Sequence, residues 1–183
     1  MAEMFRNVGR MKTGYSPEEV NEFFTHAREI FEGTKPGAMT PSQVQRTSFA
    51  LVRGGYAPDS VDAAMDRIAQ AFADLEREQF IPQHGQQAWI DRLTEQAQTL
   101  YPRLSRPAGE RFAPPKRGKI GYDRDQVDEL CERLIGYFDH GEPLSADTVR
   151  SALFTPRRGK NAYDEGSVDA FLARAVAIIL AVG

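Results

Sequence analysis

The stretch Gly14-Tyr15-x4-Val20-Asn21 decides the fold, because the same pattern returns three more times along the chain. The other copies are Gly55-Tyr56-x4-Val61-Asp62, Gly121-Tyr122-x4-Val127-Asp128 and Ala162-Tyr163-x4-Val168-Asp169. The step from Tyr15 to Tyr56 has the same length as the step from Tyr122 to Tyr163, so the two halves of the chain carry their motifs at matching positions. Repeats at fixed periods indicate that one structural unit is doubled and that the pair is then doubled again.

Each copy predicts the start of an amphipathic helix. The residue after the tyrosine is Ser16, Asp123 or Asp164 in three of the copies, and these residue types cap helix N-termini. Beyond each valine, apolar residues recur at offsets 3, 4, 7, 10 and 11, which is the period of one helix face. We expect four helices that pack on one another, with structural roles for Tyr15, Val20, Tyr56, Val61, Tyr122, Val127, Tyr163 and Val168.

Three further features of the repeats predict local structure. The glycine before the tyrosine indicates either an unusual backbone conformation or a close approach of two segments. Thr40 and Ser145 each begin what we interpret as a short capped helix ahead of the second and fourth copies. Phe5 and Phe112, which lie equally far ahead of Tyr15 and Tyr122, are candidates for matching contacts in the other two copies.

The stretch 73–108 lies outside the repeats. Pro82 and Gly85 are predicted to break the preceding helix, and 86–101 is predicted to form another. Trp89 lies on the apolar face of this second helix. We expect the helix to pack in the core, since an exposed tryptophan is unfavourable; the alternative is a helix that only bridges the two halves.

The predicted fold class is therefore all-α. It consists of four related short-helix units, each a loop, a Gly-Tyr turn and an amphipathic helix, packed in pairs with one or two extra helices between the halves. The expected domains are 1–82 with the first two repeats, a connecting helix at 83–108, and 109–183 with the last two repeats. A single compact domain is the alternative.

Composition describes an ordinary globular chain, with 41% hydrophobic and 27% charged residues. The net charge of −3 gives no argument for nucleic acid as a partner. The apolar tail at 175–182 is too short to cross a bilayer. The single cysteine, Cys131, excludes an internal disulfide framework and fits a reducing cytoplasm.

No arrangement of side chains in the sequence indicates catalysis. His26, His84 and His140 lie far apart, and Cys131 falls on an apolar helix face, where it is interpreted as a core thiol. Neither a zinc-type spacing nor a glycine-rich nucleotide motif is present. We expect no enzyme, no cofactor and no metal; a small-molecule or catalytic pocket between the units is the minor alternative.

Basic residues gather in the loops ahead of the Gly-Tyr steps. Such loops, leading into helix N-termini, can bind anions. Three interpretations remain open: solvated loop charges, contacts to anionic lipid headgroups, or contacts to an acidic protein surface. The candidate binding residues are Arg10, Lys12, Arg53, Lys116, Arg117, Lys119, Arg157, Arg158 and Lys160.

The repeated motif resembles the N-terminal domain of DivIVA-type proteins. The likeness is carried by Arg53-Gly54-Gly55-Tyr56 with Val61-Asp62, and by Tyr163 followed by Val168-Asp169-Ala170-Phe171-Leu172. The whole chain is similar to actinobacterial proteins with several DivIVA-like repeats. Copy two has Leu51-Val52-Arg53 where the family carries an exposed phenylalanine–arginine pair, so the resemblance carries over the basic residues and not an aromatic tip.

The resemblance implies a non-enzymatic adaptor of bacterial cell division or polar growth. Its expected partner is an unidentified protein of that machinery, its location is the cytoplasm, and it is a monomer or a homodimer. The alternative is a peripheral protein that binds anionic lipids at the inner face of the cell membrane.

Overall fold

The computed structural model describes residues 4–182, and most of these residues are helical. The chain divides into two compact units, Met1–Glu78 and Gln79–Gly183, which we call unit 1 and unit 2. The boundary between the units falls inside one long helix. Each unit is described separately below.

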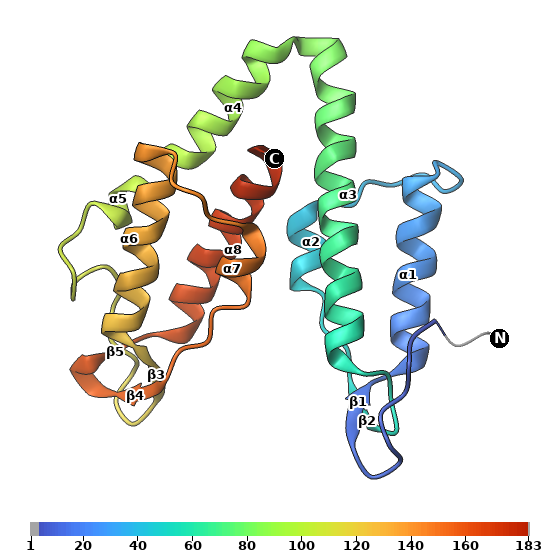
Figure 1. The fold of residues 1–183 in the computed structure, drawn as a ribbon, viewed down its shortest axis with the longest axis horizontal. Coiled ribbons are helices and arrows are strands. Elements are labelled where there is room, and N and C mark those ends of the chain that lie inside the picture. Colours follow the sequence, from blue (N-terminus) through green and yellow to red (C-terminus); the bar gives the residue numbers. More distant parts are fainter. Residues whose placement is uncertain (1–3, 183) are drawn as a thin grey trace. The chain divides into compact units, whose positions relative to one another are not determined.

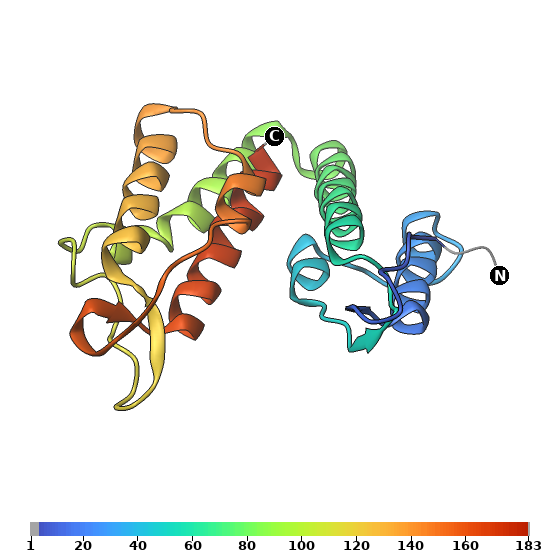
Figure 2. The ribbon, with the colours of Figure 1, turned by 60° about the horizontal axis from the view of Figure 1, so that its bottom comes forward.

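Unit 1 contains a strand and a long helix, followed by a short helix, a strand and a second long helix (Figure 1). These elements are β1 (Thr13–Tyr15), α1 (Pro17–Phe31), α2 (Pro41–Arg46), β2 (Leu51–Arg53) and α3 (Pro58–His84). The two long helices lie side by side in both ribbon views, and the strands lie at one end of the pair (Figures 1 and 2).

Unit 2 begins with the last turns of α3 and two helices, and then continues with short strands that alternate with helices. The elements are α4 (Gln86–Gln98), α5 (Tyr101–Leu104), β3 (Ile120–Asp123), α6 (Arg124–His140), α7 (Ala146–Arg150), β4 (Pro156–Arg158), the 3-10 turn η1 (Gly159–Asn161), β5 (Ala162–Tyr163) and α8 (Glu165–Val182).

Two small antiparallel sheets correct the prediction of an all-helical chain. In unit 1, β1 pairs with β2, with Thr13 opposite Arg53. In unit 2, β3 lies between β4 and β5, with Tyr122 opposite Tyr163. The predicted Gly-Tyr turns are thus extended segments, because two of them meet in each unit and satisfy each other's backbone hydrogen bonds.

The helix that follows each Gly-Tyr step buries the valine that begins its predicted apolar face, whereas Phe31 at the end of that face in α1 is exposed. Val20, Val61, Val127 and Val168 each have 0% of their surface exposed. Burying one such side chain stabilises the fold by about 1.5–3 kcal/mol. The predicted caps also form: Ser16 Oγ accepts from the backbone N–H of Glu19, and Asp123 accepts from Asp125 and Gln126.

Close backbone approach explains the glycine before the tyrosine. A Cβ on Gly14 would lie 2.3 Å from the carbonyl oxygen of Tyr56, and one on Gly55 would lie 2.4 Å from that of Tyr15. In unit 2 a Cβ on Gly121 would lie 2.1 Å from the carbonyl oxygen of Tyr163. None of these glycines has a positive φ angle, so the first of the two predicted reasons does not apply.

The short leader helices form where the sequence predicted them. Thr40 and Gln43 make a reciprocal capping box at the start of α2, and Ser145 caps α7. Phe5 packs against Tyr56 at a ring distance of 5.5 Å, and Phe112 packs against Tyr163 at 5.2 Å. The two phenylalanines therefore make matching contacts in the two units.

The segment between the repeats packs within unit 2. The prediction that Pro82 breaks the preceding helix is wrong: α3 continues through it to His84 and ends at Gly85, whose φ of 87° suits glycine. Trp89 is only 4% exposed and Leu100 is fully buried, which confirms a core position for this segment. No helix among residues 4–182 combines the length and the apolar character required to cross a membrane.

We predict that Gly121→Ala lowers the free energy of unfolding by about 1–3 kcal/mol, since the added methyl group must push two backbones apart. Gly166→Ala is the matched control, because a Cβ there meets nothing closer than 3.7 Å. Urea unfolding of both variants measures the difference. Equal stability of the two variants would contradict the close-approach argument.

Candidate functional site

The polar residues of the repeated motif pair across the helices of each unit. In unit 1 the hydroxyl of Tyr56 donates to Asn21 Oδ1 at 3.2 Å, and the hydroxyl of Tyr15 interacts with Asp62. In unit 2 the hydroxyl of Tyr163 donates to the carboxylate of Asp128 at 3.0 Å. Each tyrosine therefore bonds to the motif of the other helix in its unit.

The fourth such pair joins Tyr122 and Asp169. The pKa of Tyr122 is raised to about 12, mainly because the side chain is buried and also because Asp169 is negatively charged and accepts its hydrogen bond. The same causes, with Asp128 as the partner, raise the pKa of Tyr163 to about 12. Both tyrosines therefore stay protonated at neutral pH and act as hydrogen-bond donors and not as bases.

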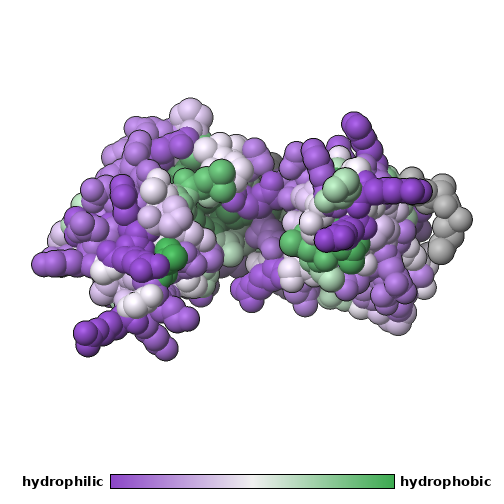
Figure 3. All heavy atoms as spheres, turned by 90° about the horizontal axis from the view of Figure 1, so that it is seen from below, coloured by the Kyte–Doolittle hydropathy of each residue, from purple (hydrophilic) through white to green (hydrophobic). Residues whose placement is uncertain are grey.

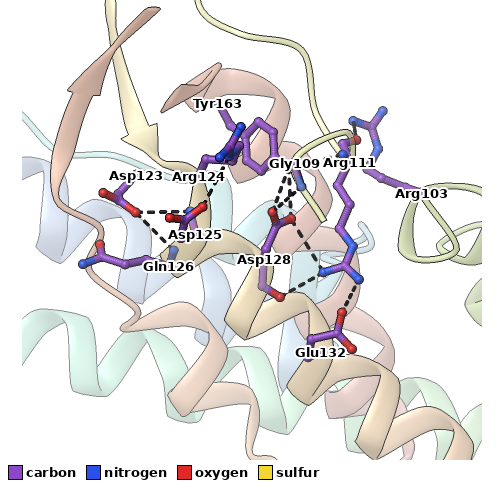
Figure 4. A network of polar contacts seen from close by, with 10 residues as sticks. All are labelled: Arg103, Gly109, Arg111, Asp123, Arg124, Asp125, Gln126, Asp128, Glu132 and Tyr163. Carbon is purple, nitrogen blue, oxygen red and sulfur yellow. Dashed lines mark hydrogen bonds and ion pairs between the residues drawn. The ribbon is translucent and has the colours of Figure 1, made fainter. Parts of the chain in front are cut away.

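A buried arginine extends the Tyr163–Asp128 pair into a network (Figure 4). Arg111 is 3% exposed and forms ion pairs with Asp128, at 3.6 Å, and with Glu132. Its guanidinium also donates to the backbone carbonyl of Asp128 at 2.9 Å. The backbone N–H of Gly109 donates to Asp128 Oδ2 at 2.7 Å. Together these bonds hold the loop before β3 against α6.

The charged groups of the network pair with one another, although the buried Nε of Arg111 has no hydrogen-bond partner among residues 4–182. A buried charge is tolerated when an opposite charge and hydrogen-bond donors face it. Unit 1 keeps two bonds of this arrangement. The Tyr56 hydroxyl donates to Asn21, as that of Tyr163 does to Asp128. The backbone N–H of Met4 donates to the Tyr56 hydroxyl at 3.2 Å, as that of Arg111 does to Tyr163 at 3.3 Å. We interpret these contacts as structural.

The other groups considered for chemistry are buried or dispersed. Cys131 has no exposed surface, and burial raises the pKa of its thiol to about 12; a protonated, enclosed thiol is a poor nucleophile. This confirms its interpretation as a core residue. Among residues 4–182, no three histidine, cysteine or carboxylate side chains converge in a way that could bind a metal ion.

All nine predicted binding residues are exposed. In unit 1 three of them, Arg10, Lys12 and Arg53, lie close together at the end of the strands. Arg53 is the last residue of β2 and lies opposite Thr13, and the backbone carbonyl of Lys12 accepts a hydrogen bond from Gly54. Arg10 precedes this pair, and its Cα lies 3.8 Å from the position of a Cβ on Gly54. The fold thus brings together two basic loops that are far apart in the sequence.

The strand end of unit 2 gathers the other six. Arg157 and Arg158 of β4 lie opposite Gly121 and Ile120 of β3. Lys160 follows in η1, while the remaining three lie in the loop before β3: Lys116, Arg117 and Lys119. Arg157 is partly occupied, since its Nε donates to Asp123 at 2.7 Å and thereby lowers the pKa of that carboxyl.

Exposed apolar side chains lie among these basic residues. In unit 1 the exposed fractions are 96% for Met11, 64% for Leu51 and 36% for Val52. Figure 3 looks onto this end of the unit and shows a hydrophobic patch bordered by hydrophilic residues. In unit 2 the exposed apolar residue is Ile120, 46% exposed, which lies opposite Arg158. We call the surface formed by Arg10, Met11, Lys12, Leu51, Val52 and Arg53 the strand-end surface of unit 1.

The basic part of this surface is evident from the sequence, whereas the apolar part was missed. The family resemblance directs attention to an aromatic residue beside an arginine, and this chain has none there. The signal was present in Leu51-Val52, two aliphatic residues directly before Arg53. They were not recognised because their exposure depends on which faces of the short β1–β2 pair the helices cover.

Comparison of the chain with protein-family models, with curated proteins and with solved structures finds no match in any of the three.

We predict that the stability of the fold decreases as the pH rises from about 10 towards 12. Unfolded tyrosine ionises near pH 10.0, whereas the pKa values of Tyr122 and Tyr163 are about 12 in the fold. The folded state therefore binds more protons in this window, and stability that is fully present below pH 10 is lost above it. Urea unfolding at several pH values measures this loss.

Tyr122→Phe and Tyr163→Phe each remove one of the raised groups, so each variant should lose less stability over the same interval. A loss as steep in the variants as in the parent chain would show that these tyrosines do not carry the effect.

Proposed function

We propose that this chain is a DivIVA-related, non-enzymatic adaptor of bacterial cell division or polar growth that binds a protein of that machinery. We further infer that its four repeats pack in pairs, one pair in each unit. The proposal places the protein in the cytoplasm, where a free buried thiol such as that of Cys131 is expected.

The observation that supports this proposal is how the repeated residues are used. The tyrosine and the asparagine or aspartate of each motif join one helix to the other within a unit. The most regular part of the sequence therefore builds a rigid framework. In such a protein, activity is expected on the surfaces that the framework presents.

A fluorescent fusion of the full chain tests the proposal in the bacterium that encodes it. We predict that the fusion concentrates at division sites or growing poles, since an adaptor follows its partner. Fluorescence microscopy measures the distribution, with the unfused fluorescent protein as the control. A uniform distribution through the cytoplasm, equal to that of the control, would contradict the proposal.

A second candidate function is binding to anionic membranes through the strand-end surface of unit 1. There, Met11 and Leu51 are largely exposed between Arg10, Lys12 and Arg53. Apolar side chains that enter the headgroup region, flanked by cations that meet lipid phosphates, are the usual elements of peripheral binding. This arrangement favours lipid over plain solvation of the loops.

For this second candidate we predict that Arg53→Glu weakens co-sedimentation with phosphatidylglycerol-containing vesicles at least about tenfold, since each cation near an anionic surface contributes roughly 1 kcal/mol and the glutamate adds repulsion. Leu51→Glu should weaken it as well. Lys35→Glu changes the same charge beyond the far end of α1 and serves as the matched control.

Binding should also weaken as salt is raised, because salt screens exposed charges. If Lys35→Glu reduced binding as much as Arg53→Glu, or if the parent chain did not bind at low salt, the membrane candidate would be wrong.

A further inference from the structure

Unit 1 contains an open apolar groove between its two long helices. The groove has a volume of about 410 Å³. Phe24 and Phe31 line it from α1, and Ile68 and Phe72 are among the residues that line it from α3. Phe31 is 47% exposed, and Met4, which also borders the groove, is 44% exposed. Large apolar side chains are thus exposed along this groove.

The corresponding positions in unit 2 are covered. When the repeats are aligned by their tyrosines, the groove residues Phe24, Ile68 and Ala71 correspond to Cys131, Ala175 and Ile178. The exposed fractions of these three unit 2 residues are 0%, 0% and 2%. They share one core cluster with Leu100 and Leu104, which the α4–α5 segment contributes. The α4 helix packs on α8, and α5 packs on α6.

A hydroxyl of the α4–α5 segment also bonds to the edge of the covered groove. Tyr101 donates to the carboxylate of Asp139 at the end of α6, which raises the pKa of the tyrosine to about 12. In the same alignment Asp139 corresponds to Glu32, which borders the open groove of unit 1. The acceptor is therefore present in unit 1, whereas the helix that would meet it is not.

Two of the three charged residues that border the open groove are arginines and the third is Glu32, so the balance of charge favours an acidic occupant. Arg28 and Arg67 border it from α1 and α3, and both are exposed. In unit 2 the counterpart of Arg28 is the apolar Ile135. Among residues 4–182, no ion pair connects either arginine to a carboxylate of the chain. Two cations on opposite edges complement carboxylates on a segment that lies between them.

We propose that the groove of unit 1 binds an acidic amphipathic helix of a partner protein, one that presents an apolar face like that of α4–α5. The occupant carries small or leucine side chains spaced as Ala97, Leu100 and Leu104 are, and acidic residues on its flanks. This inference rests on the proposed adaptor function and identifies the surface through which the adaptor holds its partner, a helix-in-groove contact.

The test uses the full chain and synthetic peptides that copy residues 86–105. In one peptide Thr94 and Gln98, both exposed on α4, are replaced by glutamate; in the other they are replaced by lysine. Both peptides keep the same apolar face. Unit 2 already covers its own groove with α4–α5, so an added peptide is expected to bind at unit 1, and fluorescence anisotropy measures the binding.

The acidic peptide should bind saturably and more tightly than the basic one. Ala71→Arg fills the groove and should weaken binding at least about tenfold. Ala63→Arg adds the same side chain at an exposed position of α3 outside the groove and should leave binding unchanged. Arg67→Glu should reverse the preference between the two peptides.

Three outcomes would overturn the proposal: no binding of the acidic peptide at up to roughly 1 mM, equal binding to the Ala71→Arg and parent chains, or a chain dimer that Ala71→Arg dissociates in analytical ultracentrifugation. The last would show that a second copy occupies the groove. If the acidic peptide does not bind but the fusion concentrates at poles or septa, the groove proposal is wrong and the adaptor proposal stands. If the peptide binds but the fusion does not concentrate there, the adaptor proposal is wrong and the groove still binds an acidic helix.

Discussion

The backbone contact between the two motif tyrosines, Tyr15 with Tyr56 and Tyr122 with Tyr163, is the constraint on which each unit depends. The carbonyl oxygen of one tyrosine lies where a side chain of the opposite glycine would be, and the two tyrosine backbones bond to each other at 2.8–3.0 Å in unit 1. Because the two backbones are this close, the helices that follow them, α1 and α3 in unit 1, start next to each other and run side by side (Figure 1). The valines can then bury their side chains, and each hydroxyl reaches the carboxylate or amide of the other helix.

Helix positions were predictable from the sequence, because a buried helix face leaves a period of 3.6 residues whatever surrounds it. The valine positions, the caps at Ser16 and Ser145, and the buried Trp89 all follow from local pattern. The strands were not predictable, since β1 and β2 are very short and each exists only through a partner from a distant part of the sequence. The prediction for Pro82 failed because a proline forfeits one backbone hydrogen bond without having to end the helix, and the bond from Gly85 to Ile81 continues past it.

For the candidate site, the sequence identified charges and missed their surroundings. Exposure of a lysine or an arginine can be assumed from its type, but exposure of Met11 or Leu51 depends on where the helices end. Arg111 was overlooked for the opposite reason. An arginine is rarely buried, and only the folded chain brings Asp128 and Glu132 to it from the next helix. The open groove was likewise not predictable from the sequence, because only the fold shows that α4–α5 covers the α6–α8 pair and leaves the α1–α3 pair open.

Ala162 stands where the other three motifs have glycine, and it is 1% exposed. In a symmetric homodimer, any such replacement would occur in both chains and so on both sides of the two-fold axis. A single chain that contains both sides can change one and keep the other, as Gly121 opposite Tyr163 illustrates. One covalent chain is likewise free to keep an open apolar groove in one unit and a covered core in the other.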